Sequence, residues 1–211
     1  MPLKPTTVPD APPAPEAPAY VPAATPPAGR APSGLGARLR ARRAGARGAA
    51  FGRGVVVEVA KGARLEIEPG VAIGDGCHIV VRGGSVRIAA GATLGERCRL
   101  IAHERIEIGP GAVLGDEAVA VDFDHRYDDV ERPVRLQGIA TAPVSVGANA
   151  RIGARAAIQR GVAIGDGAEV GPLAVVTRSV AAGARAGGVP ALSPSGRRSG
   201  TPGGSRSRRD R

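Results

Sequence analysis

Aromatic residues are scarce in this chain of 211 residues, which has two Phe, two Tyr and no Trp. Large rings usually fill much of the volume of a globular core. The hydrophobic content is nevertheless 43%, so almost all of it is aliphatic. Ile, Val, Leu and Ala suit a narrow interior that leaves little volume to fill. The composition therefore argues against an ordinary globular core.

Long apolar segments are also missing. The chain has no run of about 18 apolar residues, the length needed to span a bilayer. Residues 1–33, rich in Pro and Ala, contain no apolar stretch of the kind that a secretory signal needs. We therefore expect a cytoplasmic protein with no membrane span. The two cysteines, Cys77 and Cys98, match no zinc-ligand spacing, and we expect them to be reduced, buried thiols.

The net charge of +10 comes from the two ends of the chain. Residues 1–53 carry eight Lys or Arg against two acids, and residues 192–211 carry six Arg against one Asp. Residues 54–191 hold 15 basic and 16 acidic residues and are close to neutral. A basic total can indicate a nucleic-acid binder, but here the central region has no such excess.

Aliphatic residues recur at every sixth position late in the chain. They are Val146, Ile152, Ile158, Ile164, Val170 and Val176. A period of six fits neither an α-helix nor a simple alternating strand. It is typical of a coil of short strands in which one side chain in six points inward and stacks on the next coil. The late region is therefore predicted to be an all-β parallel β-helix of hexapeptides.

A looser repeat precedes it, in residues 54–120. Three segments align, beginning at Val71, Ala92 and Ala112, so each early coil has two or three residues more than three hexapeptides. Pro-Gly or Ala-Gly pairs precede each segment and supply turn chemistry. We place these extra residues at a corner of each coil.

The repeats divide the chain. Residues 1–33 are predicted to be a disordered Pro/Ala-rich segment, and residues 34–53 a basic linker or a short helix that caps the first coil. Residues 54–192 are predicted to form the β-helix domain, with the loop 122–143 protruding where the period breaks. Residues 193–211 are predicted to be a disordered basic tail.

His125 is the strongest catalytic candidate, because it lies in the long loop and beside the aromatic residues Phe123 and Tyr127. Long loops on rigid repeat scaffolds often carry function. A neutral imidazole can accept a proton from a hydroxyl near physiological pH, and a nearby carboxylate can fix its tautomer. Asp122 and Asp124 are both candidates for that carboxylate.

The chain resembles the hexapeptide acyltransferases with a left-handed parallel β-helix, in particular the maltose, galactoside and polysaccharide O-acetyltransferases. The resemblance covers about residues 55–192. It rests on the late repeats, on the loop from Asp124 through Arg132-Pro133 to Gln137-Gly138, and on the Gly-Val-Pro-Ala sequence at 188–191. The handedness is implied by the resemblance and not by the period.

The resemblance implies an enzyme that moves an acetyl group from acetyl-CoA to a hydroxyl of a sugar or polysaccharide-type acceptor. His125 would be the general base, with no acyl-enzyme and no metal. It also implies a homotrimer with active sites between neighbouring subunits. Six residues fall where the family contacts the pantetheine and adenosine parts of the donor: Gly153, Ala154, Gly171, Pro172, Thr177 and Arg178.

Two other functions remain open. The chain has three histidines, His78, His103 and His125, which could form the zinc site of an enzyme like the γ-class carbonic anhydrases. Against this, their positions in the repeat differ. Alternatively, the chain is a non-catalytic scaffold whose basic flanks bind anions. Those flanks lack aromatics at base-stacking intervals, so we expect no specific nucleic-acid recognition.

Overall fold

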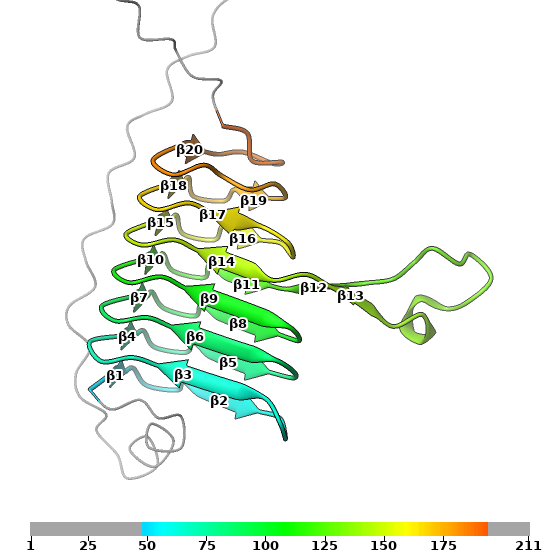
Figure 1. The fold of residues 1–211 in the computed structure, drawn as a ribbon, viewed down its shortest axis with the longest axis horizontal. Coiled ribbons are helices and arrows are strands. Elements are labelled where there is room, and N and C mark those ends of the chain that lie inside the picture. Colours follow the sequence, from blue (N-terminus) through cyan, green and yellow to red (C-terminus); the bar gives the residue numbers. More distant parts are fainter. Residues whose placement is uncertain (1–47, 194–211) are drawn as a thin grey trace, which may run out of the picture.

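Three parallel sheets form the faces of a triangular prism in the computed structural model, which describes residues 48–193 (Figure 1). Each coil of the chain contributes one short strand to each sheet in turn, which we call sheets A, B and C. The predicted all-β parallel β-helix is therefore confirmed.

Sheet A has seven strands and sheets B and C have six and five. The strands of sheet A are β1 (Ala50–Phe51), β4 (Ala72–Ile73), β7 (Thr93–Leu94), β10 (Val113–Leu114), β15 (Arg151–Ile152), β18 (Glu169–Val170) and β20 (Arg185–Ala186). Those of sheet B are β2 (Val56–Val59), β5 (His78–Val81), β8 (Arg99–Ala102), β11 (Val119–Val121), β16 (Ala157–Ile158) and β19 (Val175–Val176). Those of sheet C are β3 (Arg64–Ile67), β6 (Ser85–Ile88), β9 (Arg105–Ile108), β14 (Val144–Val146) and β17 (Ala163–Ile164).

The six aliphatic residues at hexapeptide spacing all point into the prism, where each is at most 2% exposed. They visit sheets C, A and B in rotation, beginning with Val146, Ile152 and Ile158. Each also pairs with the residue one coil away, as Ile152 does with Val170. The period of six therefore measures the distance from one face of the prism to the next.

The extra residues of the early coils lie between sheets B and C. There β5 and β6 have four residues each, whereas β16 and β17 have two. The Pro-Gly and Ala-Gly pairs instead turn the chain from sheet C to sheet A, and Gly70 and Gly91 adopt positive φ there. Glycine tolerates that conformation at little cost. The lengthened corner is also the one from which the long loop leaves.

The first strand, β1, begins at Ala50, within the predicted 34–53 linker. Residues 34–47 of that linker, the 1–33 segment and residues 194–211 of the basic tail lie outside the described residues. Residues 187–193 follow the last coil, where Leu192 and Gly187 form an antiparallel bridge. Within residues 48–193, no helix has both the length and the apolar character needed to cross a membrane.

Candidate functional site

The long loop is an arm that projects from the corner between sheets B and C (Figure 1). Its root is an antiparallel hairpin of β12 (Phe123–His125) and β13 (Ile139–Thr141). A 3-10 turn, η1 (Val134–Leu136), lies near its tip. The Gln137 side chain donates to the carbonyls of Asp129 and Arg132, both at 2.7 Å, and thereby ties the tip together.

His125 ends β12 and is exposed to solvent. It lies opposite Ile139 in the hairpin register, and its ring is edge-on to that of Phe123, with 6.3 Å between centroids. On its other side the Phe123 ring packs against His103, with 4.5 Å between centroids. His125 is thus presented on the arm close to its root, where a reacting group could reach it.

The two candidate carboxylates have different surroundings. Asp122 is fully buried, and its side chain accepts hydrogen bonds from three backbone N–H groups of residues 103–105, at 2.7–2.8 Å. Asp124 is exposed and accepts a bond from the backbone N–H of His125 at 2.8 Å. Within residues 48–193, neither carboxylate bonds to the imidazole of His125.

The six residues assigned to the acyl donor divide between two corners. Gly153, Ala154, Gly171 and Pro172 lie between sheets A and B, which we call the AB corner. Thr177 and Arg178 lie between sheets B and C, the BC corner from which the arm also leaves. Sheet B separates the two groups, so one chain does not bring them together.

These six positions also differ in exposure. Pro172, Thr177 and Arg178 are exposed, whereas Gly153 is buried. A Cβ atom on Gly153 would lie 2.4 Å from the backbone nitrogen of Pro172 in the next coil. Such an approach is too close for any side chain, so stacking of the coils already explains glycine at position 153.

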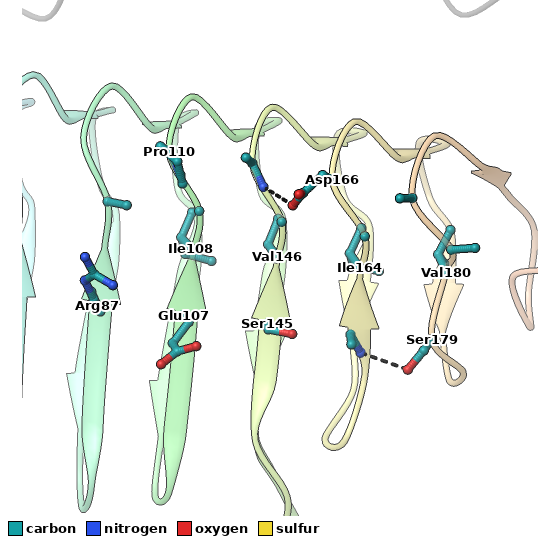
Figure 2. A pocket seen from close by; sticks show the side chains of 18 of the residues that line it. Arg87, Glu107, Ile108, Pro110, Ser145, Val146, Ile164, Asp166, Ser179 and Val180 are labelled. Carbon is teal, nitrogen blue, oxygen red and sulfur yellow. Dashed lines mark hydrogen bonds between the residues drawn. The ribbon is translucent and has the colours of Figure 1, made fainter.

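The outer face of sheet B is largely apolar. Its outward side chains alternate with the buried ones along each strand. Exposed Glu58, His78 and Arg99 point outward in the first three coils, beside half-buried aliphatic groups in the second to sixth coils. The aliphatic groups include Val80, Ile101, Val119, Val121, Ala157 and Val175. Sheet C instead turns charged or small polar groups outward, such as Arg87, Glu107 and Ser145 (Figure 2). An apolar strip of this kind is typical of a protein–protein contact.

The histidines do not converge. His78 begins β5, and His103 follows the opposite end of the neighbouring β8, four residues along the sheet or roughly 13 Å away. One zinc ion holds its imidazole ligands at about 2 Å. No group of three potential metal ligands comes together within residues 48–193. A single chain therefore offers no three-histidine zinc site.

An open groove of about 840 Å³ runs along sheet C and its corner with sheet A (Figure 2). Its wall includes Glu107 and Ser145 from neighbouring coils and Ser179 from two coils further on. Ser179 accepts a hydrogen bond from the Ala163 N–H at 3.0 Å, and Asp166 accepts one from the Ala148 N–H at 2.7 Å. None of the sequence-predicted site residues lines this groove.

The late repeats match a known family of repeat sequences. Residues 143–178 match the family model described as bacterial transferase hexapeptide (six repeats). The match coincides with the run of strands from β14 to β19. Residues 143–178 carry bacterial transferase hexapeptide repeats. The resemblance to hexapeptide-repeat proteins seen in the sequence is thereby confirmed.

One curated relative of this hexapeptide-repeat chain is a probable acetyltransferase from Mycobacterium tuberculosis. It is 37% identical over 117 residues, which make up 54% of this chain and 39% of that protein. The chain thus spans about two fifths of the length of the relative it matches.

Two solved structures share the fold. AntD, an N-acyltransferase from Bacillus cereus, was crystallised with dTDP and 3-hydroxybutyryl-CoA. It superimposes with a TM-score of 0.60 at 19% identity, over 70% of this chain and 79% of that one. A hexapeptide-repeat acetyltransferase from Vibrio cholerae gives a TM-score of 0.52 at 21% identity, over 67% and 73% of the two chains.

Two contacts in this region were not predicted from the sequence. One is the buried position of Asp122 against the neighbouring coil; the other is the packing of His103 on Phe123. In both, a residue of one coil meets a residue of the next, about twenty positions away. The break in the repeat after Ala120 was the available signal, since a chain that leaves its coil must leave unpaired backbone groups behind.

Proposed function

We propose that this protein is an acyltransferase that moves an acetyl group from acetyl-CoA to a hydroxyl of a sugar or polysaccharide-type acceptor. The observation that carries the proposal is the position of the arm and the two donor corners around sheet B. Each of these three parts borders that sheet. The hexapeptide repeats and the acetyltransferase relative support the reaction class.

The site is completed when three copies turn sheet B toward a common axis. In that arrangement the AB corner of one copy lies beside the BC corner of the next. Ala154 and Pro172 of one copy then face Arg178 of its neighbour, close to the root of the neighbour's arm. The apolar outer face of sheet B is buried in the same step, which gives the assembly its driving force.

The donor groups have matching chemistry. Arg178 is exposed and makes no ion pair with a carboxylate within residues 48–193, so its guanidinium is available to a phosphate. The AB corner offers backbone groups at Ala154 and a flat surface at Pro172 for an extended chain with amide groups. Such a groove suits the pantetheine and nucleotide parts of acetyl-CoA.

His125 acts as the general base in this mechanism. Its neutral imidazole takes the proton of the acceptor hydroxyl while the oxygen attacks the thioester carbonyl. The carbon–sulfur bond then breaks, and His125 returns the proton to the departing sulfur. One histidine therefore serves both proton transfers, and the acetyl group passes directly to the acceptor oxygen.

Calorimetric titration with acetyl-CoA, followed by assays of thiol release on a panel of saccharides, tests the proposal. We expect about one donor site per chain, and turnover that His125→Ala abolishes while donor affinity stays nearly unchanged. His78→Ala is the matched control and should retain activity, because His78 begins β5, three coils before Ala154 and at the end of sheet B opposite the arm. Absent donor binding, or turnover that survives His125→Ala, would contradict the proposal.

Arg178→Ala tests the donor orientation. Loss of one charge-assisted phosphate contact should weaken acetyl-CoA binding about tenfold, which corresponds to about 1.4 kcal/mol. Binding of acetyl-pantetheine, which has no nucleotide, should be unaffected by the same change. Equal losses for both ligands would show that Arg178 does not contact the nucleotide phosphates.

A further inference from the structure

Asp122 is the only buried charged residue within residues 48–193. Its carboxylate accepts the backbone N–H of His103 on one oxygen, at 2.8 Å. The other oxygen accepts the N–H groups of Glu104 and Arg105, at 2.8 and 2.7 Å. A buried carboxylate is costly unless it is well bonded, and three donors aimed at one side chain satisfy that need.

The three backbone N–H groups that bond to Asp122 belong to the BC corner of the coil before the arm. One coil earlier, the same corner bonds to backbone carbonyls of the next coil: Arg82 N–H to Ala102 at 2.7 Å and Ser85 N–H to Glu104 at 3.1 Å. After Asp122 the next coil leaves the prism to form the arm, so those carbonyls are missing. The carboxylate of Asp122 takes their place.

Asp122 is therefore attached to the prism and to the arm at once. Its backbone carbonyl accepts the N–H of Ala142 at 2.9 Å, which closes the hairpin at its root. Phe123 follows directly and packs on His103, whose own N–H bonds to Asp122. His125 lies only three residues beyond this attachment.

We propose that Asp122 is the positioning residue of the catalytic arm: it fixes the direction in which the hairpin leaves the BC corner, and with it the place of His125. This role differs from that of a carboxylate that bonds to the imidazole and fixes its tautomer. The inference rests on the proposed function, because it takes His125 to be the base.

Asp122→Asn is the test, because it keeps the size of the side chain. The amide can still accept the His103 N–H, but its NH2 group then faces the two donors at Glu104 and Arg105. A misplacement of about 1 Å of a catalytic group can reduce the rate about 100-fold. We expect kcat to fall by about that factor while the KM for acetyl-CoA stays within about twofold.

Asp75→Asn is the matched control. Asp75 is also a corner aspartate whose carboxylate accepts a backbone N–H from a neighbouring coil, that of Arg53 at 2.7 Å, but it lies far from the arm in sequence and in its coil. This variant should lower the thermal midpoint without lowering kcat. Comparable kcat losses in both variants would overturn the proposal, since they would reflect general loss of stability.

Two further measurements separate positioning from direct contact with the imidazole. The pH–rate profile of Asp122→Asn should keep its apparent pKa and lose only height, because removal of a carboxylate bonded to His125 would lower that pKa. Hydrogen exchange should become faster in the hairpin amides, such as Arg126, which bonds to the Gly138 carbonyl at 3.0 Å. A lowered apparent pKa, or unchanged hairpin exchange, would overturn the proposal.

The exchange measurement needs no substrate. If wild-type protein shows no acyl transfer and Asp122→Asn still loosens the hairpin, then the attachment stands and the proposed function fails. If wild-type protein is active and the hairpin is unaffected by the substitution, then the attachment fails and the function stands.

Discussion

Side-chain volume inside the narrow prism decides how much a buried residue contributes to stability. Cys98 and Leu100 are both 0% exposed and lie two positions apart in the same coil. Leu100 fills the space inside sheet B, whereas Cys98 occupies the AB corner at a position that Cys77 and Ala118 fill in the coils on either side. The corner position therefore accepts a small group, and the face position does not.

We predict that Leu100→Ala and Cys98→Ala differ sharply in stability. Deletion of a buried Leu side chain leaves a cavity and typically costs about 2–5 kcal/mol. Cys98→Ala removes a single sulfur at a position where Ala already occurs one coil later, and should cost about 1 kcal/mol or less. Denaturant unfolding of both variants measures the difference. Equal losses would show that the corner is packed as tightly as the face.

The thiols themselves should be inert in the folded protein. A hydrogen bond between the thiols of Cys98 and Cys77, together with burial, raises the pKa of the Cys98 thiol well above its ordinary value. Cys77 is fully buried as well, which denies access to a reagent. We expect no reaction with a thiol-specific reagent under native conditions and two thiols per chain in denaturant. Rapid native labelling would contradict the burial of this pair.

At the scale of the structural element, charged side chains stack along the AB corner. Arg97, Glu117 and Arg155 all adopt positive φ at equivalent places in successive coils. Glu117 accepts bonds from Arg97 at 2.9 Å and from Arg155 at 2.8 Å. A left-handed conformation is costly for a residue with a Cβ atom, and the ion pairs between coils offset part of that cost.

This ladder should make stability depend on acid. Hydrogen bonds from Arg155 and then Arg97 hold the pKa of Glu117 below its ordinary value of 4.5. A depressed folded pKa adds stability that is complete above 4.5 and is lost as pH falls toward the lower, folded pKa. Glu117→Gln should therefore flatten the fall of the denaturation midpoint below pH 4.5. Glu131→Gln, a control in the arm, should leave that slope unchanged.

The repeat was predictable from sequence because one face of the prism follows the last at every sixth residue. The spacing of Val146 and Ile152 predicts the next inward residue from local sequence alone, and the break in the repeat after Ala120 predicts the arm. The bonds of Asp122 were not predictable in this way. They join it to residues 103–105, and only the stacking of coils brings those residues together. The division between two corners of the six residues assigned to the acyl donor likewise follows from where each coil turns.

At the scale of the whole molecule, the three faces of the prism differ in how they meet water. Sheet B presents half-buried aliphatic groups beside three exposed polar or charged side chains, whereas sheet C presents an open groove whose lining includes charged residues. The arm also carries exposed apolar residues, with Val130 at 92% and Leu136 at 53% exposure. The aliphatic groups of sheet B and the apolar residues of the arm are both costly to expose in a lone chain, and both lie beside the BC corner. Association of copies through sheet B would cover that face and bring the arms against neighbouring subunits.

A matched pair of valines tests this arrangement. Val119 and Val113 belong to the same coil, are both half-buried, and point outward from sheets B and A. Val119→Lys should dissociate the proposed trimer and abolish acetyl-CoA binding together. It replaces an apolar contact group with a cation beside Arg99 of the neighbouring coil, and the added like charges of three copies would meet in the contact. Val113→Lys places the same charge on sheet A and should leave both properties intact. Light scattering coupled to size exclusion reports the assembly, and calorimetry reports the donor. A trimer that survives Val119→Lys would place the contact on another face. A monomer that still binds acetyl-CoA with full affinity would show that one chain holds the whole donor site.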